Sequence, residues 1–178
     1  DQKMLKEQVK RFLEDKSSLD KVRKVLESDA DYDEALWKGL CELGVAGAAI
    51  PEEYGGLGLG ALELCVVAEE LGRAVAPVPF SSSIYLAAEA IRLFGNEDQK
   101  NKYLNSIVNN KMKFAVGFSE YIAARNNFGF LFKNNTVSGK SIFVLDVENS
   151  THLLIADEAG QIGVININDK NIKLTELT

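Results

Sequence analysis

The sequence has 178 residues, of which 46% are hydrophobic and 26% charged, and its 20 Lys and Arg against 26 Asp and Glu give a net charge of −6. This length suits one domain of about 150 residues with a remainder, or two small domains that share a core. The composition excludes a disordered or collagen-like chain, no apolar run approaches the ~20 residues of a membrane helix, and the acidic balance argues against a general nucleic-acid binder, which needs clustered Lys and Arg.

The first 112 residues are predicted to be helical. Near the amino terminus, apolar residues recur at the spacing of an amphipathic helix: Leu5, Val9, Phe12 and Leu13. Asp31, with Glu34 three residues later, is predicted to open the next helix as a capping box. That helix should end at Gly44, because glycine commonly occupies the position after a helix.

Three more helices are predicted in this part of the chain. The first covers residues 61–71 and ends at the glycine that follows, and its wide apolar surface predicts burial on more than one side. The second spans residues 83–94 and is also closed by a glycine. Asn96 and Gln99 then have the spacing of the N-cap and third residue of a last helix.

From residue 113 the pattern changes to short segments rich in β-branched and aromatic residues. Five strands are predicted: residues 114–118, 128–132, 141–145, 152–156 and 162–167. Asn134-Asn135 is predicted to form a hairpin turn. Helices followed by strands indicate an α+β protein with a helical domain over residues 1–112 and a β domain over residues 113–178, because a parallel α/β sheet would need the two to alternate.

Generic functional motifs are weak in this chain. Gly56, Gly58 and Ala61 match a dinucleotide fingerprint, but the match lies between two helices and lacks the preceding strand, so a close-packed loop is favoured. His152 is the only histidine and has no second His or Cys nearby, which favours a structural role over a metal site. The pair Glu69-Glu70 is expected at the solvated edge of its helix, with a buried polar network as the alternative.

The two cysteines also lie in apolar helical patterns. Cys41 and Cys65 are therefore predicted to be buried, reduced thiols. Because no amino-terminal signal peptide is visible either, we expect a cytoplasmic protein without a disulfide.

Four blocks of this sequence, in matching order and spacing, resemble the amino-terminal domain of the acyl-CoA dehydrogenase family. They cover most of residues 34–120. The blocks are Leu36-Trp37-x-x-Leu40-x-Glu42-Leu43-Gly44, Ile50-Pro51-Glu52-Glu53-Tyr54-Gly55-Gly56-Leu57-Gly58, Glu69-Glu70-Leu71-Gly72-Arg73 and Phe94-Gly95-Asn96-Glu97-Asp98-Gln99. The variant Arg73-Ala74-x-Ala76-Pro77-x-Pro79-Phe80 is similar to a bacterial branch whose members often work as paired, unequal subunits on steroid side chains or other bulky acyl-CoAs.

The resemblance implies a helical amino-terminal domain, an antiparallel β-barrel-like middle domain and a carboxy-terminal helical domain, with FAD between them. The implied reaction, α,β-dehydrogenation of an acyl-CoA thioester, belongs to fatty acid metabolism: a carboxylate takes the α-proton and flavin N5 the β-hydride. An electron-transfer flavoprotein would reoxidise the flavin, and homo- or hetero-oligomers with other acyl-CoA dehydrogenase subunits are expected. Residues 61–71 and 83–94 are candidate walls of the apolar acyl slot, with plain core packing as the alternative.

Two segments that match the family supply the candidate cofactor-binding residues. They are Phe118, Ser119, Phe143, Val144 and Leu145. Ser119 keeps the hydroxyl of the family's flavin-edge segment, but residues 121–124 depart from the pattern that follows. Phe143 replaces a tryptophan beside the isoalloxazine and keeps a stacking surface. Leu145 stands where the family has a hydroxyl residue and cannot donate a hydrogen bond to N5.

The resemblance also implies that the chain stops inside the middle domain, so that the carboxy-terminal domain and its usual catalytic carboxylate are absent. The catalytic base is therefore unknown, and we expect no turnover from these 178 residues alone. Two hypotheses remain. One is an FAD-dependent acyl-CoA dehydrogenase whose catalytic half is not in view. The other, motivated by residues 121–124 and Leu145, is a non-catalytic subunit that gives fold and interface to an active paralogue.

Overall fold

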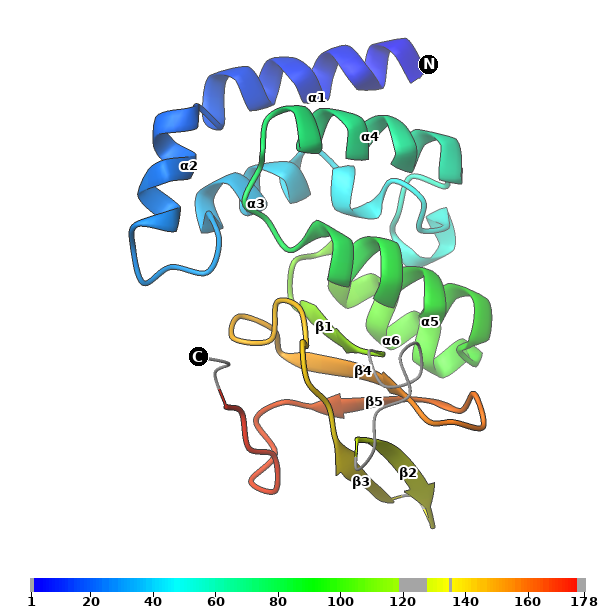
Figure 1. Ribbon diagram of the computed structural model, residues 1–178. Coiled ribbons are helices and arrows are strands. Elements are labelled where there is room, and N and C mark those ends of the chain that lie inside the picture. The colour runs from blue at the N-terminus through cyan, green and yellow to red at the C-terminus, as the bar shows by residue number, and fades with distance from the viewer. Residues whose placement is uncertain (1, 119–127, 135, 176–178) are drawn as a thin grey trace. The chain divides into compact units, whose positions relative to one another are not determined.

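The computed structural model describes residues 2–118, 128–134 and 136–175, which form two compact units, Asp1–Lys111 and Met112–Thr178 (Figure 1). The described helices all lie in the first unit and the described strands in the second. The expected α+β class is therefore confirmed.

The helical unit is built from short helical segments, some of which begin with a side-chain cap. In the described residues they are α1 (Gln2–Lys16), α2 (Leu19–Leu26), α3 (Glu34–Glu42), η1 (Val45–Gly47), η2 (Glu52–Tyr54), α4 (Ala61–Arg73), η3 (Ser81–Ala88), α5 (Glu89–Phe94) and α6 (Glu97–Val108). The capping box at α6 is confirmed, because Asn96 and Gln99 each accept a 2.9 Å hydrogen bond from the backbone N–H of the other. The cap of α3 is Asp33 and not Asp31, since the Asp33 carboxylate accepts from the N–H of Leu36 at 2.9 Å.

Helix α4 is longer and more one-sided than its composition predicts. It continues to Arg73, and its buried residues Leu64, Val67, Glu70 and Leu71 fall on one face. Leu62 is 58% exposed on the other side, so the expected burial on more than one side is wrong. Cys65 is exposed and Cys41 half-buried, which corrects their prediction as buried thiols, although neither forms a disulfide.

The segment predicted as one helix over residues 83–94 has two geometries. Residues Ser81–Ala88 form a π-helix, η3, and the chain continues from it into the α-helix α5. Phe80 packs edge-on against Tyr85 within this segment and against Trp37 of α3, with ring centroids 5.0 and 6.3 Å apart. Because Trp37 and Phe80 are each 2% exposed, these rings form a central part of the helical core.

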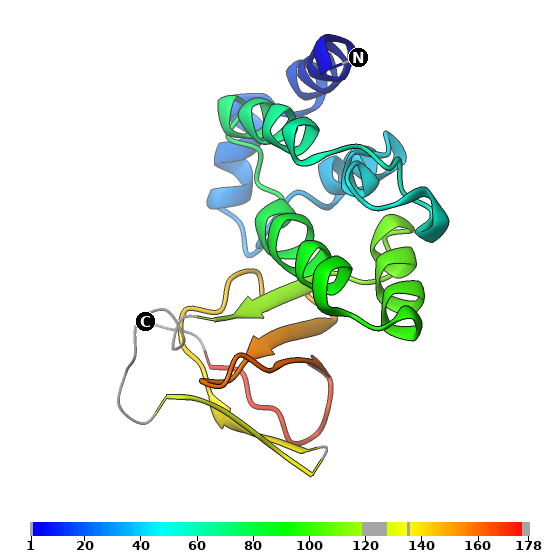
Figure 2. The same cartoon turned by 90° about the vertical axis from the view of Figure 1, so that its right-hand side faces the viewer.

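The strand unit contains a three-stranded sheet and a separate hairpin. The sheet has the order β1 (Phe114–Gly117), β4 (His152–Ala156), β5 (Ile162–Asn166), and the hairpin pairs β2 (Gly129–Lys133) with β3 (Thr136–Lys140) (Figures 1 and 2). β4 and β5 are antiparallel, but β1 and β4 are parallel. The expectation of a wholly antiparallel domain is wrong at this one pairing, which the long connection between β1 and β4 makes possible.

The hairpin register follows from its turn. Lys133 pairs with Thr136 across the predicted Asn-Asn turn, and Asn134 has the positive φ of +49° that such two-residue turns require. The Phe132 ring lies where a side chain at Gly163 of β5 would be, so the hairpin packs closely on the sheet. A strand therefore forms at Thr136–Lys140, and the strand predicted over residues 141–145 does not form.

Candidate functional site

The candidate cofactor segment of the strand unit is a turn that lies beside β1. Leu145 forms an isolated antiparallel bridge with Val116. A β-carbon added at Gly117 would meet the Ser141 hydroxyl at 3.2 Å, so residue 141 also lies against this strand. Phe118, which directly follows β1, is half-buried. The structure thus brings the segment 141–145 to the carboxyl end of β1, where Phe118 lies.

Two residues of this turn have an unusual backbone conformation. Phe143 and Asp146 have φ values of +55° and +57°, in the left-handed region that non-glycine residues rarely occupy. Such conformations cost of order 1–3 kcal/mol and concentrate at functional sites. Phe143 and Leu145 are 57% and 56% exposed.

Val144 has the opposite environment to its two neighbours. It packs against the buried cluster of Ala115, Leu153 and Ile155 on the sheet. It therefore anchors the turn to the sheet while the flanking aromatic and aliphatic side chains remain exposed. Of the other candidates, Ser119 and the divergent residues 121–124 lie outside the described residues.

The candidate slot walls in the helical unit are joined by Tyr85. Its hydroxyl donates a 3.0 Å hydrogen bond from η3 to the backbone carbonyl of Leu64 in α4. Burial raises the pKa of Tyr85 to about 12. Leu86 and Leu93 are 41% and 57% exposed on this segment. Because π-helical geometry is frequent at functional sites, η3 is a better candidate than a regular helix would be.

The backbone amides of the glycine-rich loop between η2 and α4 donate hydrogen bonds to carbonyls of the same helical unit. Leu57 N–H donates to Gly47 at 2.9 Å, and Gly58 N–H donates to Ile50 at 2.9 Å. A side chain at Gly56 would collide with the Ile50 carbonyl. These contacts agree with the close-packed loop favoured over a dinucleotide site, since the amides that would hold a phosphate are already bonded to the chain.

A second linkage in this unit is the hydrogen bond from the Tyr54 hydroxyl to Glu97, at 2.8 Å. It joins η2 to the start of α6. The bond to the carboxylate raises the pKa of Tyr54 to about 12 and lowers the pKa of Glu97. Glu97 also pairs with Lys100 at 3.1 Å, so its negative charge is stabilised from two sides.

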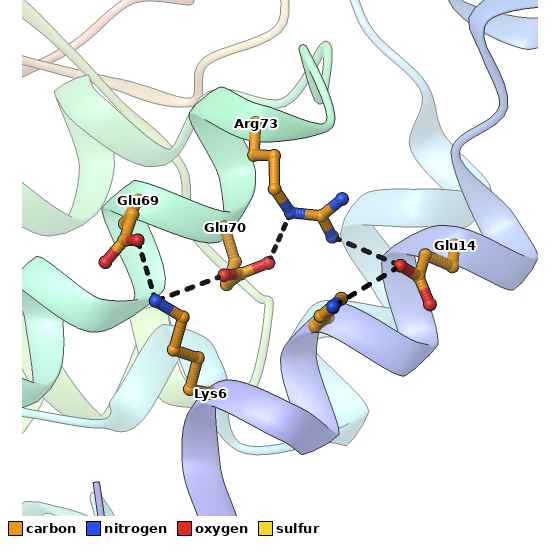
Figure 3. Close-up of polar contacts among 6 residues, drawn as sticks. Lys6, Glu14, Glu69, Glu70 and Arg73 are labelled. Carbon is orange, nitrogen blue, oxygen red and sulfur yellow. Dashed lines mark hydrogen bonds and ion pairs between the residues drawn. The ribbon is translucent and has the colours of Figure 1, made fainter. Parts of the chain in front are cut away.

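Helices α1 and α4 are connected by an ionic cluster (Figure 3). Glu70 is only 1% exposed, so the expectation that the pair Glu69-Glu70 lies at a solvated edge is wrong for Glu70. Arg73 donates to its carboxylate at 2.7 Å from the next turn of α4. Lys6 reaches the same carboxylate from α1 at 3.7 Å. The spacing of Glu70 and Arg73 was a signal for this pair, because residues three apart on a helix are neighbours.

Two further classes of site find no support in the described part of the chain. No group of three or more His, Cys, Asp or Glu residues there has the arrangement of a metal site. His152 stacks on Phe114 at 5.4 Å and contacts the Thr151 hydroxyl at 2.9 Å. No described helix has the length and apolar character needed to cross a membrane.

Comparison with known proteins defines the family. The model of the acyl-CoA dehydrogenase N-terminal domain matches residues 1–111, so this chain belongs to the acyl-CoA dehydrogenase family. Mitochondrial isovaleryl-CoA dehydrogenase of Arabidopsis thaliana is 33% identical over 140 residues, which cover 78% of this chain and 34% of that protein. Acyl-CoA dehydrogenase IpdE2 of Mycolicibacterium smegmatis is 42% identical over 80 residues, 44% of this chain and 26% of that protein.

Solved structures agree with this assignment. A variant of the Tcur3481–Tcur3483 steroid acyl-CoA dehydrogenase superposes with a TM-score of 0.82 at 28% identity, covering 94% of this chain and 48% of that chain. The match extends across both the helices and the strands. The chain spans about half of that structure and about a quarter to a third of the two sequence relatives.

Proposed function

We propose that this chain is the amino-terminal part of an FAD-dependent acyl-CoA dehydrogenase, which forms a Cα–Cβ double bond in an acyl-CoA thioester. The match of residues 1–111 to the family's amino-terminal domain is the observation that carries this proposal. FAD, when bound, would supply the acceptor for the β-hydride. The residues of this chain would hold the flavin, wall the acyl slot and exclude water. Residues 113–178 would form part of the middle domain, and no residue of this chain is assigned as the catalytic base.

The described residues fit a flavin in part. Phe143 presents an exposed aromatic face suited to a flat ring system, and Val144 fixes the turn that carries it. Phe118 would contact the ring from the end of β1, and Ser119 would contribute the hydroxyl that the family resemblance implies. Leu145 contributes an apolar surface but no hydrogen-bond donor, so any donor to N5 must be a backbone amide or another residue.

The helical unit would contribute the acyl slot. Leu62 of α4 and Leu86 and Leu93 of the η3–α5 segment are large apolar side chains that remain exposed in this chain. The hydrogen bond of Tyr85 to Leu64 fixes the distance between the two helical segments. An apolar slot of this kind excludes water and strengthens the electrostatic interactions that stabilise an enolate-like thioester.

A flavin titration of the full-length protein tests the proposal. We expect a yellow protein whose flavin band bleaches when an acyl-CoA is added. Phe143→Ala should weaken FAD binding about three- to tenfold, the range of one aromatic stacking contact. Leu131→Ala, which removes a comparably exposed side chain from the hairpin, is the matched control and should leave FAD affinity unchanged. A full-length protein that stays colourless with added FAD would contradict flavin binding.

The alternative is a non-catalytic subunit that provides fold and interface to an active paralogue. Leu145 favours it, because an apolar residue replaces the expected hydroxyl. One matching structure is also named for two components, Tcur3481 and Tcur3483. Under this alternative the protein alone is inactive and co-expression with its paralogue restores acyl-CoA-dependent dye reduction. Full activity of the homomeric protein would exclude it. The electron-transfer flavoprotein, the oligomer and the cytoplasmic location are parts of the proposal to be tested with the full-length protein.

A further inference from the structure

Glu70 is the only charged side chain that is buried among the described residues of the helical unit. It lies on the face of α4 that packs against α1 (Figure 3). One of its oxygens accepts from Arg73 of the same helix at 2.7 Å, and the other lies 3.7 Å from Lys6 of α1. The carboxylate therefore takes one cation from its own helix and one from the neighbouring helix.

Two exposed ion pairs cross the same contact on either side of Glu70. Lys6 also binds Glu69 at 2.7 Å, and Arg73 lies 3.8 Å from Glu14 of α1. The side chains of these four residues are 39–63% exposed. The apolar part of the contact on α1 includes Val9 and Leu13, both fully buried. The attachment of α1 thus combines a short apolar strip with an alternating row of charges.

We expect a buried carboxylate to stabilise this contact less than an apolar residue of similar volume would. Desolvation of a buried ion pair often offsets its Coulombic attraction, and an apolar replacement of similar volume is commonly neutral or stabilising. When α1 leaves, Glu70 becomes hydrated and keeps its ion pair with Arg73, since that pair lies within α4. Separation of the helices therefore exposes less apolar surface and leaves Glu70 paired, while Lys6 and Glu69 lose each other and become hydrated at the surface.

We propose that α1 is a detachable strap on α4, released as a unit when salt screens the ion pairs that cross the contact. Exposed pairs are weakened by screening far more than buried apolar contacts are. The hydrogen bond to Glu69 raises the pKa of Lys6, and the hydrogen bond to Glu70 raises the pKa of Arg73. Both cations thus remain charged at physiological pH, so ionic strength acts on ion pairs that are fully formed.

Native-state hydrogen exchange of the full-length protein, followed between 0.02 and 0.5 M NaCl, tests the strap. We expect amides of α1 near Val9 and Leu13 to exchange through an opening of their own. Their exchange should become about three- to tenfold faster over this range, as expected for the loss of the two exposed ion pairs. The amides of α4 near Val67 should not respond. Exchange of α1 and α4 through one common opening at every salt concentration would overturn the proposal.

Glu70→Leu provides the complementary variant. It removes the buried charge, while Lys6 keeps Glu69 and Arg73 keeps Glu14. We expect slower exchange in α1 and an unchanged salt response of the outer pairs. Glu42→Leu changes an exposed glutamate of α3 that pairs with Lys38 at 3.9 Å, and as the control it should not alter exchange in α1. Faster exchange of α1 in Glu70→Leu would also overturn the proposal. If that variant does not fold, the wild-type salt series decides alone.

Discussion

Asn110 performs two tasks at the end of α6, one with its backbone and one with its side chain. It adopts a φ of +52° after the helix, and its N–H bonds to the carbonyl of Ile107 at 2.9 Å, which ends the helix in a Schellman motif. Its Oδ1 accepts a 2.8 Å hydrogen bond from the indole N–H of Trp37. A single residue thus ends α6 and satisfies the only polar group of the buried indole.

Asn110→Gly separates these two tasks. Glycine retains the backbone conformation but leaves the Trp37 N–H without its acceptor, so the free energy of unfolding should fall by about 1–3 kcal/mol. Trp37 is the only tryptophan, and its fluorescence should shift in the folded variant. Urea unfolding followed by that fluorescence measures both effects. Asn109→Ala, at the exposed neighbouring position, should cost less. Equal losses from both variants would show that the indole bond contributes little.

The pKa shift of Tyr54 predicts an alkaline transition. Its pKa is about 12 in the folded protein and about 10 when unfolded, so the folded state binds the proton more tightly. The stability from this group is complete below pH 10 and is lost as pH rises toward 12. Urea midpoints should therefore fall over this range, and fall less steeply in Tyr54→Phe. Absorbance at alkaline pH should show Tyr54 and Tyr85 ionising at higher pH than an ordinary tyrosine. Urea midpoints that fall in parallel for the wild type and Tyr54→Phe would refute the assignment of the alkaline transition to Tyr54.

At the scale of elements, the end of α4 carries an avoidable conformational cost. Val75 closes the helix in a Schellman motif, with its N–H bonded to Gly72 and the N–H of Ala76 bonded to Leu71. Its φ is +47°, which is costly for a β-branched side chain. The glycine expected to fill this position, Gly72, instead lies inside the helix.

Glycine at position 75 and a side chain at position 72 should each stabilise the protein. Val75→Gly relieves the left-handed strain of about 1–2 kcal/mol. Gly72→Ala adds a good helix former where no atom lies within 4 Å of the new side chain, for a gain of up to about 1 kcal/mol. Thermal unfolding should show a gain in stability for each single variant. The double variant should show nearly the sum of the two gains. Gly44→Ala is the opposing control, because its φ of +78° should make alanine destabilising. Destabilisation by Val75→Gly would contradict the assignment of backbone strain to Val75.

Some elements of this fold were predictable from the sequence and others were not. The hairpin turn and the α6 capping box were predictable because both depend on residues two or three apart. The strand β3 was missed because Thr136–Lys140 is largely polar, and its pairing is set by the turn and by Phe132 packing over Gly163. The more apolar residues 141–145 looked like a strand but form a turn beside β1. The π-helix has no sequence signal that periodicity could detect.

For the whole molecule, the order of helices before strands determined the α+β class, and the blocks over residues 34–120 determined the family. The candidate cofactor residues depended on the family resemblance alone. The geometry adds what that resemblance lacked: Val144 is an internal anchor, whereas Phe143 and Leu145 are exposed on a turn. The buried position of Val144 depends on its packing against a cluster that includes Ala115 and Ile155, and no local sequence pattern encodes that packing. The flavin titration tests cofactor binding by the full-length protein, and the exchange experiment tests the contact between α1 and α4.

The parallel pairing of β1 with β4 has a consequence during protein synthesis. β1 ends at Gly117, and its sheet partner does not begin until His152, so the ribosome must add about 35 more residues before pairing starts. At 5–20 residues per second, this takes roughly 2 to 7 s. All four residues of β1 are buried in the finished protein, so a newly made apolar strand waits for its sheet partner β4 for that time. The helical unit is by then fully synthesised, and an apolar strand that waits in this way is a site where aggregation can begin.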